Sequence, residues 1–333
     1  MKSISVVILN YNGAEMLRNF LPTLLRNTPA MVEVVVADNA STDDSVTVMQ
    51  NLFPKVTLIK LERNWGFAEG YNRALQQVKS DYYVLLNSDV EVTEGWIEPM
   101  LSVMENDAAI AACQPKILDY KRKTHFEYAG AAGGFIDFYG YPYCRGRIFD
   151  TVEQDVGQYD EICDIFWASG AALMIRSEDY HKTGGFDGRF FAHMEEIDLC
   201  WRLHLRSRRI VCVPQSTVYH VGGATLNYNN PRKTYLNFRN NLLMLYKNLP
   251  SKEYRKVMFA RSILDYVAAC KFLIGGDYGS FKAVMKARAD FRKMKPVYKD
   301  VVKSATVDLP QRVGFSILWK YYICRCKKYI QLK

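Results

Sequence analysis

Polar side chains with metal-binding or hydrogen-bonding groups follow short hydrophobic runs in the first part of the chain. Asn10 follows one such run, Asp38 follows a second, and Asn87-Ser88-Asp89 follows a third. A carboxylate such as Asp89 can hold Mg²⁺ or Mn²⁺, hard cations that neutralise the charge of a diphosphate. Each of these residues also suits a turn that ends a strand. The pattern therefore leaves two interpretations of each loop, a turn or a ligand site.

Two loops among these hydrophobic runs carry additional signals. Ser41 or Thr42 is expected to cap a helix that follows, whereas Asp38 precedes the cap and can make a specific hydrogen bond. Gly66 and Gly70 permit close approach of a ligand to the backbone. Their surroundings match neither G-x-G-x-x-G nor G-x-x-x-x-G-K-[ST], which argues against dinucleotide and ATP binding.

Three carboxylates within four residues form a candidate for acid–base chemistry. Glu195 and Asp198 would share one face of a helix with a following arginine, where an ion network is the structural explanation. Glu196 would point elsewhere, and the like charge of Glu195 would raise its pKa toward that of a general base. His220 follows another strand-like run. Such a histidine is usually structural, but together with Asp89 it is a candidate metal ligand.

The elements that must position these side chains alternate between strand-like and helix-like patterns. Hydrophobic runs cover residues 4–9, 32–37, 56–61 and 82–86, and helical patterns at 14–25, 45–52 and 71–78 lie between them. Nearly continuous apolar strands predict an α/β fold with a parallel sheet covered on both faces. Ligands bind at the carboxyl ends of such strands, so Asn10, Asp38, Asn64 and Asp89 are expected to converge on one rim. The aromatic and glycine-rich segment 113–159 predicts strands and long loops that cover a site.

The charge of the chain is divided unevenly. The 333 residues carry 44 Lys+Arg and 35 Asp+Glu, a net charge of +9, and 49% of the residues are hydrophobic. That hydrophobic fraction excludes a disordered or collagen-like chain. Residues 1–231 have a net charge of −8 and residues 232–333 a net charge of +17. An acidic body with a basic extension is therefore expected, rather than a uniformly basic protein that binds nucleic acid.

The remaining composition bears on compartment and membrane contact. Eight cysteines are too sparse for a disulfide scaffold, and free thiols are expected at Cys324 and Cys326. Buried thiols in a reducing compartment are expected at Cys113, Cys144, Cys163, Cys200, Cys212 and Cys270. Residues 1–9 leave no room for a signal peptide. No apolar stretch is long enough to span a membrane. Ile263, Val267, Cys270 and Ile274 recur at helical spacing, which predicts a helix packed on the body. Aromatic and basic residues mix in 315–332, a composition typical of contact with an anionic membrane surface. A cytoplasmic protein, peripheral on the inner face of the plasma membrane, is expected.

Six motifs in a fixed order resemble those of family 2 glycosyltransferases, in particular the rhamnosyltransferase-like and galactofuranosyltransferase-like branch. They are VILNYN at 7–12, DNASTD at 38–43, N-x-G-F-A-x-G-x-N at 64–72, LNSD at 86–89, EE-x-DL at 195–199, and His220. The resemblance implies the GT-A fold, a Rossmann-like and mostly parallel central sheet flanked by helices. It implies a catalytic domain over 1–245, with a nucleotide-sugar half at 1–112 and an acceptor and metal half at 113–245. A basic helical extension over 246–333 completes the expected organisation.

The resemblance also implies roles for individual residues. The donor nucleotide sugar would contact Asn10, Tyr11, Asp38, Asn39, Ser41, Asn64, Gly66, Phe67, Gly70, Asn72, Asn87 and Ser88, with Tyr11 stacking on the base and Asp38 bonding to it. The acceptor would contact Trp167, Gly170, Asp198 and Trp201. Asp89 and His220 would hold a divalent cation, Mg²⁺ or Mn²⁺, and Asn87 replaces the first acid of a D-x-D-type motif. Glu196 matches the catalytic base, and its length, greater than that of the usual Asp, leaves Glu195 as a second candidate.

The expected activity is inverting transfer of a sugar from a nucleotide diphosphate to a hydroxyl of a glycan or lipid-linked saccharide, in cell-surface polysaccharide biosynthesis. The transferred sugar would be rhamnose, galactofuranose, a hexose or an N-acetylhexosamine. A non-catalytic sugar-nucleotide-binding protein is the first alternative, although it would not need Glu195 and Glu196. A nucleic-acid-binding protein is the second, although the acidic body offers no recognition motif.

Overall fold

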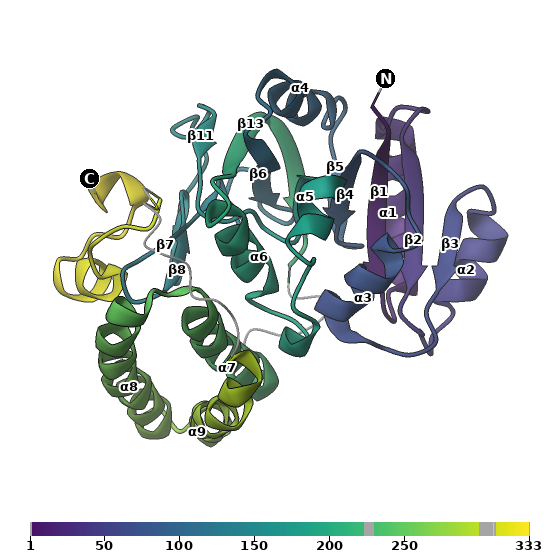
Figure 1. Cartoon of the computed structure of the whole chain (residues 1–333). Coiled ribbons are helices and arrows are strands. Elements are labelled where there is room, and N and C mark those ends of the chain that lie inside the picture. The colour runs from purple at the N-terminus through teal and green to yellow at the C-terminus, as the bar shows by residue number, and fades with distance from the viewer. Residues whose placement is uncertain (1, 223–229, 300–308, 310, 333) are drawn as a thin grey trace.

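A mixed central sheet flanked by helices forms most of the molecule, and three long helices and a C-terminal tail lie beside it (Figure 1). The computed structural model describes residues 2–222, 230–299, 309 and 311–332. The strands of the central sheet are β1 (Ile4–Asn10), β2 (Glu33–Asp38), β3 (Thr57–Lys60), β4 (Tyr82–Leu86), β5 (Val90–Val92), β6 (Ile110–Asp119), β11 (Cys163–Asp164), β12 (Ala172–Arg176) and β13 (Arg209–His220). The helices are α1 (Ala14–Asn27), α2 (Ser45–Leu52), α3 (Gly66–Leu75), α4 (Glu98–Asn106), α5 (Ser177–Lys182), α6 (Glu195–His204), α7 (Pro231–Asn248), α8 (Ser251–Ile274) and α9 (Tyr278–Met294).

The sheet has the order β11-β13-β6-β12-β4-β1-β2-β3, with β5 paired to β13. β1 is parallel to β2 and β4, and β2 is parallel to β3, since a helix connects each strand to the next. β12 lies antiparallel between β4 and β6. The predicted α/β fold is therefore confirmed, with a parallel half at β4-β1-β2-β3 and a mixed half beyond it.

Two hydrophobic cores cover the two faces of the sheet. Alternate residues of β1 point to opposite faces, so that Val6 belongs to one core and Val7 to the other. Helices α1, α2 and α4 cover the face of Val6, where α1 contributes Leu17 and Leu21 at helical spacing. Helices α3 and α6 cover the face of Val7, where α3 contributes the fully buried Tyr71. Burial on both faces explains why the strands are almost continuously apolar.

Two local expectations differ from the structure. The helical pattern at 71–78 belongs to α3, which already begins at Gly66. The expected cap at Ser41 or Thr42 is wrong, because α2 begins only at Ser45. The Ser41 hydroxyl instead accepts hydrogen bonds from Asn10 Nδ2 and from the backbone N–H of Asn12. It thereby ties the loop after β2 to the loop after β1.

A small second sheet is built from the aromatic segment in the middle of the chain. Its strands are β7 (Gly134–Ile136), β8 (Pro142–Cys144), β9 (Arg147–Ile148) and β10 (Thr151–Val152). The C-terminal tail packs on it, because the ring of Tyr329 lies 5.1 Å from that of Phe135 and the Ile317 N–H donates to Asp137. The strands expected in this segment are present, and the tail covers them.

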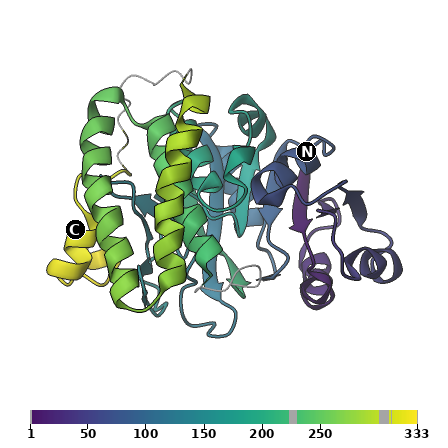
Figure 2. The ribbon, with the colours of Figure 1, turned by 90° about the horizontal axis from the view of Figure 1, so that it is seen from below.

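Helices α7, α8 and α9 pack on one another beside the sheet (Figure 2), and α8 and α9 lie within the expected basic extension over 246–333. The predicted divisions at residues 112 and 245 lie inside β6 and α7. No helix within the described part of the chain combines the length and apolarity needed to cross a lipid bilayer. Of the cysteines expected to be buried thiols, four are fully buried, Cys163 is partly buried and Cys270 is exposed.

Candidate active site

The ends of β1 and β2 place the first two candidate residues side by side. Asn10 and Asp38 are partners in the parallel register, and Asn10 Nδ2 donates to Asp38 Oδ1 over 3.2 Å. Asp38 Oδ2 accepts from the backbone N–H of Ser41 over 2.9 Å. Both side chains are buried, and Asn10 Oδ1 has no hydrogen-bond partner among the described residues. Next to them the ring of Tyr11 is exposed, so it is free to stack on a ligand.

The predicted donor segment forms the N-terminal end of α3 and is oriented by Asn39. Asn39 Nδ2 donates to Asn64 Oδ1 over 3.2 Å and to the Gly66 carbonyl over 3.0 Å, and Asn39 Oδ1 accepts from the Trp65 N–H. Asn39 and Asn64 therefore fix where α3 begins. The first N–H groups of α3 are paired within the protein, because that of Gly66 donates to Asn64 Oδ1 and those of Phe67 and Ala68 donate to the Phe191 carbonyl.

The two glycines of this segment serve packing inside the protein. Gly66 has a φ of +76°, and a Cβ at this position would overlap the ring of Phe191. A Cβ on Gly70 would lie 2.9 Å from Leu9 Cδ2, so this glycine lets α3 approach β1 closely. The sequence pattern had indicated glycines that admit a ligand to the backbone. The structure shows instead that these two glycines let α3 pack closely against β1 and against the loop that precedes α6.

Asn72 and Phe67 connect the donor segment to the second half of the site. Asn72 Nδ2 donates to the Phe186 carbonyl over 2.8 Å, and Asn72 Oδ1 accepts from the Phe186 N–H and the Tyr180 hydroxyl. The amide of Asn72 is thus engaged by the protein itself and positions the chain around Phe186. The Phe67 ring lies beside Tyr71 and next to Gly170. A residue expected to contact the sugar donor, Phe67, is thus adjacent to one expected to contact the sugar acceptor, Gly170.

Asp89 and His220 lie together where β4 ends and β5 pairs with β13. His220 Nε2 lies 3.1 Å from Asp89 Oδ1 and 3.4 Å from Asn87 Nδ2. The two residues are both buried. Burial would raise the pKa of Asp89, but the hydrogen bond and charge of His220 lower it. The fold therefore brings together the predicted pair of Asp89 and His220, which lie far apart in the sequence. Asn87 and Ser88 directly precede Asp89.

Glu127 is a third member of this cluster that the sequence did not reveal. Its Oε1 lies 3.5 Å from His220 Nδ1, and its Oε2 accepts a hydrogen bond from the Ala129 N–H. Burial would lower the pKa of His220, but Glu127 and Asp89 together raise it to about 10. Glu127 therefore orients the imidazole, with Nδ1 toward itself and Nε2 toward Asp89. No local pattern marks this role, because its partner lies far along the chain.

The arrangement of Asp89 and His220 fits a divalent cation. Their 3.1 Å separation is close to the spacing of about 3 Å between adjacent ligands of an octahedral Mg²⁺ site, given bonds of about 2.0–2.1 Å. Among the residues that the structure describes, no group of three or more His, Cys, Asp or Glu side chains could by itself hold a metal ion. Two protein ligands suit Mg²⁺ or Mn²⁺ that is also held by water and by the phosphates of a ligand.

The predicted base lies at the start of α6, after a loop in an unusual conformation. Phe191, His193 and Met194 have φ values of 67°, 69° and 71°, in the left-handed region that non-glycine residues rarely adopt. Asn240 on α7 holds this loop, because its Nδ2 lies 2.7–2.9 Å from the carbonyl oxygens of residues 190, 192 and 193. No local pattern in the sequence indicates this contact, which fixes the direction in which α6 begins.

Glu195 and Glu196 differ in burial and in acidity. Glu195 is buried and Glu196 is partly exposed, and each has a buried Oε2 without a partner among the described residues. Burial, reinforced by the charge of Glu196, raises the pKa of Glu195 well above the usual range. Burial also raises the pKa of Glu196 to about 7, against backbone N–H groups at the helix start that lower it. Near neutral pH, Glu195 therefore keeps its proton while Glu196 can lose its own.

Two of the expected acceptor residues lie in the core. Asp198 has no exposed surface, and its Oδ2 accepts from Lys247 over 2.8 Å and from Arg202 over 2.9 Å. Trp201 is also fully buried. Neither side chain can touch an acceptor in this structure, so we correct their assignment to structural roles. The helical ion network considered for this segment is present as Asp198–Arg202, without Glu195.

Trp167 is the remaining acceptor candidate. It is almost completely buried, and its Nε1 donates to the Phe135 carbonyl over 2.9 Å. The side chain thereby joins the central sheet to the small second sheet. The residue of this segment that lies next to Phe67 is Gly170, rather than the Trp167 indole.

Comparison with known proteins shows that this chain is similar to glycosyltransferases. The family model described as "Glycosyl transferase family 2" matches residues 5–157. The N-acetylglucosaminyl-diphospho-decaprenol L-rhamnosyltransferase of Mycobacterium tuberculosis is 27% identical over 235 residues, which are 65% of this chain and 75% of that protein. The rhamnosyltransferase WbbL of Escherichia coli is 23% identical over 163 residues, 47% of this chain and 61% of that protein.

Solved structures show the same fold. GalNAc-T7, solved with UDP, GalNAc and Mn²⁺, superposes with a TM-score of 0.60 at 17% identity, over 90% of this chain and 56% of that one. Staphylococcus aureus TarS (residues 1–349) superposes with a TM-score of 0.57 at 14% identity, over 88% of this chain and 81% of that one. The chain thus spans about half the length of the GalNAc-T7 structure. These findings confirm the GT-A fold, and they confirm the resemblance to family 2 glycosyltransferases drawn from the six motifs, with the family match covering residues 5–157.

Proposed function

We propose that this enzyme transfers a sugar, with inversion, from a nucleotide-diphosphate sugar to a hydroxyl of a saccharide or lipid-linked saccharide in cell-surface polysaccharide biosynthesis. The observation that carries the proposal is the buried Asp89–His220 pair beside the polar loops after β1 and β2. The names of the rhamnosyltransferase relatives support rhamnose as the transferred sugar, with galactofuranose, a hexose and an N-acetylhexosamine as the other candidates.

The donor nucleotide would be held by the loops after β1 and β2. The exposed ring of Tyr11 stacks on the base, and Asp38, fixed by Asn10 and Ser41, hydrogen-bonds to it. Asn64, held by Asn39, would line the nucleoside and diphosphate pocket. Asp89 and His220 would hold Mg²⁺ or Mn²⁺, which when bound neutralises negative charge on the departing nucleoside diphosphate.

Glu196 acts as the general base in this proposal. Its carboxylate takes the proton of the acceptor hydroxyl, whose oxygen forms a bond to the anomeric carbon as the bond to the diphosphate breaks. Glu195 remains protonated beside it, which avoids two adjacent buried charges. Partial exposure of Glu196 supports it over Glu195 as the group that reaches the acceptor.

A transfer assay and a binding assay test the proposal together. Purified enzyme is incubated with a panel of nucleotide sugars, Mn²⁺ or Mg²⁺, and saccharide acceptors, and thermal midpoints are recorded with the same donors. We expect at least one donor to raise the midpoint and to be consumed, and Glu196→Gln to keep the midpoint shift while losing transfer. If Glu196→Gln bound and transferred like the wild type, Glu196 would not be the base. If no donor were bound or consumed, the proposed function would be refuted.

We also propose that the C-terminal tail contacts a membrane surface, on the cytoplasmic side. Trp319 and Ile330 in this tail are exposed, and Arg325 and Lys328 are exposed nearby. Aromatic and basic side chains together suit the headgroup region of an anionic bilayer. A lipid-linked acceptor would be presented at the same surface.

A further inference from the structure

Helix α8 is turned so that Arg261 and Asp265 face the protein while several large apolar residues face outward. Arg261 and Asp265 are only 2% and 0% exposed, whereas Phe259, Val267 and Ile274 are 72%, 60% and 87% exposed. A helix on the surface of a globular protein normally buries its apolar stripe. The helical spacing of this stripe predicted packing on the body, and that prediction is wrong for Ile263, Val267, Cys270 and Ile274, which are partly or largely exposed.

A buried ion network fixes this orientation of α8. Arg261 pairs with Asp265 over 3.2 Å, and Arg288 on α9 pairs with the other oxygen of Asp265 over 2.6 Å. Arg261 also donates to the Tyr139 carbonyl and to Asn241 on α7. Rotating α8 to bury its apolar stripe would expose this network and separate its charges, which is costly. The buried ion network therefore keeps the apolar face of α8 pointing away from the protein.

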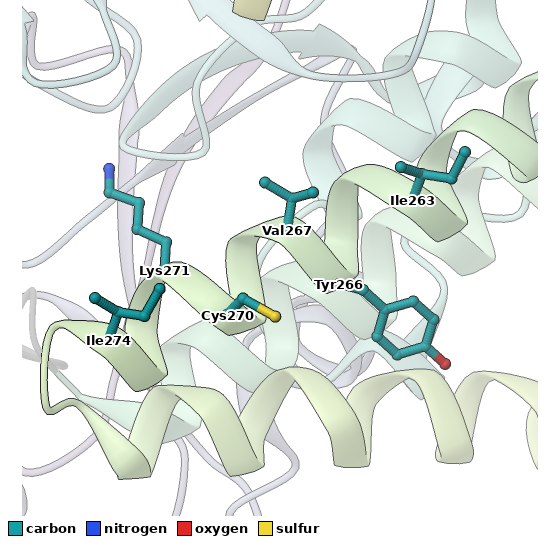
Figure 3. A pocket seen from close by; sticks show the side chains of 6 residues that line it. All are labelled: Ile263, Tyr266, Val267, Cys270, Lys271 and Ile274. Atoms are coloured by element: carbon teal, nitrogen blue, oxygen red, sulfur yellow. The ribbon is translucent and has the colours of Figure 1, made fainter.

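The outward face is continuous along most of α8. Ile263, Tyr266, Val267, Cys270, Lys271 and Ile274 line an open groove of about 540 Å³. Figure 3 shows Ile263, Val267 and Lys271 projecting toward the same side of the helix. Phe259 extends the stripe by one turn toward the N-terminal end of α8. A contiguous exposed apolar face of this kind marks a contact site on a soluble domain.

The C-terminal tail continues the same surface. Figures 1 and 2 both place the tail beside α8, and the Lys271 ammonium lies 5.5 Å from the centre of the Tyr322 ring. Trp319 and Ile323 are also exposed in the tail. We refer to this surface as the α8–tail face and define it by Phe259, Ile263, Val267, Ile274, Trp319, Tyr322 and Ile323.

The charges around the α8–tail face favour one occupant. Its exposed basic residues are Lys252, Arg255, Lys256 and Lys271 on α8, and Arg325 and Lys328 in the tail. The acidic residues of α8 are Glu253 and Asp265, which pair with Arg312 and with Arg261 and Arg288. Residues 311–332 contain no acidic residue. Two copies facing each other here would bring like charges together, whereas anionic phospholipids offer both phosphates and an apolar interior.

We propose that the α8–tail face lies on an anionic phospholipid bilayer, with Phe259, Ile263, Val267 and Ile274 among the acyl chains and the surrounding Lys and Arg at the level of the phosphates. The inference deepens the proposed membrane contact of the tail by assigning the principal contact to α8. It concerns lipid binding alone, so its outcome is separate from that of the proposed sugar transfer.

Vesicle flotation of the full chain tests this assignment. Vesicles of phosphatidylglycerol and phosphatidylcholine are compared with vesicles of phosphatidylcholine alone. The double variant Ile263→Glu/Val267→Glu places two charges in the stripe. The control variant Met31→Glu/Leu52→Glu changes two comparably exposed apolar residues, just before β2 and at the end of α2. Both β2 and α2 lie at the opposite end of the molecule from α8 (Figure 1). We expect the wild type and the Met31/Leu52 variant to float with the anionic vesicles, and the Ile263/Val267 variant to partition at least about tenfold less.

Two further measurements keep the test decisive. Quenching of tryptophan fluorescence by lipids brominated on their acyl chains is expected in the wild type and is expected to fall in Trp319→Phe, whose folded state is checked by circular dichroism. Sugar transfer to a soluble acceptor without vesicles should be the same in wild type and both double variants. Equal flotation of both double variants, or no binding of the wild type to anionic vesicles, would overturn the proposal. So would a wild-type dimer that Ile263→Glu/Val267→Glu dissociates while vesicle binding is unchanged.

Discussion

Acidification from pH 8 to pH 6 is expected to reduce sugar transfer about tenfold through protonation of one residue, Glu196. Burial raises its pKa to about 7, whereas an ordinary glutamate would stay ionised over this range. The base works only when deprotonated, so activity is present above this pKa and is lost below it. With a pKa of about 7, about nine tenths of the Glu196 carboxyls are ionised at pH 8 and about one tenth at pH 6.

The assay is the pH dependence of kcat/KM from pH 5.5 to pH 8.5, at saturating Mn²⁺ and constant ionic strength. Glu196→Gln should lower the rate roughly 10²–10⁴-fold and remove the acid limb of the profile. Glu195→Gln is the matched control, since it keeps a neutral hydrogen-bonding group where Glu195 already carries a proton, and its acid limb should remain. A wild-type profile that is flat between pH 6 and pH 8, or a Glu195→Gln variant that loses the limb, would refute the assignment.

Three substitutions test other parts of the structure. Glu127→Gln should weaken Mn²⁺ binding about 10–100-fold, because the residue orients the His220 imidazole, and titration followed by electron paramagnetic resonance measures it; unchanged affinity would remove Glu127 from the site. Lys247→Met should lower the free energy of unfolding by about 3 kcal/mol, because it leaves the buried Asp198 charge with fewer partners; urea denaturation measures this loss, and a loss below about 1 kcal/mol would contradict it. Gly66→Ala should lower both the thermal midpoint and transfer, because its Cβ would overlap the ring of Phe191 in a left-handed backbone conformation; wild-type values for both would show that the loop before α6 tolerates the change.

The sequence allowed the fold to be predicted because the sheet follows from local patterns. The apolar runs of β1, β2 and β4 and the helices between them imply parallel strands, and parallel register alone brings Asn10 beside Asp38. The first prediction needed only the rule that parallel strands end on a common edge. The pairing of Asp89 with His220 as metal ligands rested on the resemblance to the family, and the structure places the two side chains 3.1 Å apart.

The residues that the sequence could not reveal depend on long-range contacts. Glu127 orients His220 from a segment without periodic structure, and Asn240 holds the loop before α6 from α7, almost fifty residues further along the chain. The outward face of α8 was misread for a related reason. Its apolar spacing is typical of a packed helix, and only the contact of Arg261 and Asp265 with Arg288 on α9 determines which side faces the protein.

The hydrogen bonds of Asn240 to the loop before α6 also bear on how the enzyme becomes active as it is made. A chain leaving the ribosome can build the parallel strands from the first 90 residues, because those contacts are local and appear early. The loop with three left-handed residues cannot be fixed until α7 has emerged, because Asn240 supplies the donor. The direction in which α6 begins, and with it the position of Glu196, is therefore set only once α7 is present.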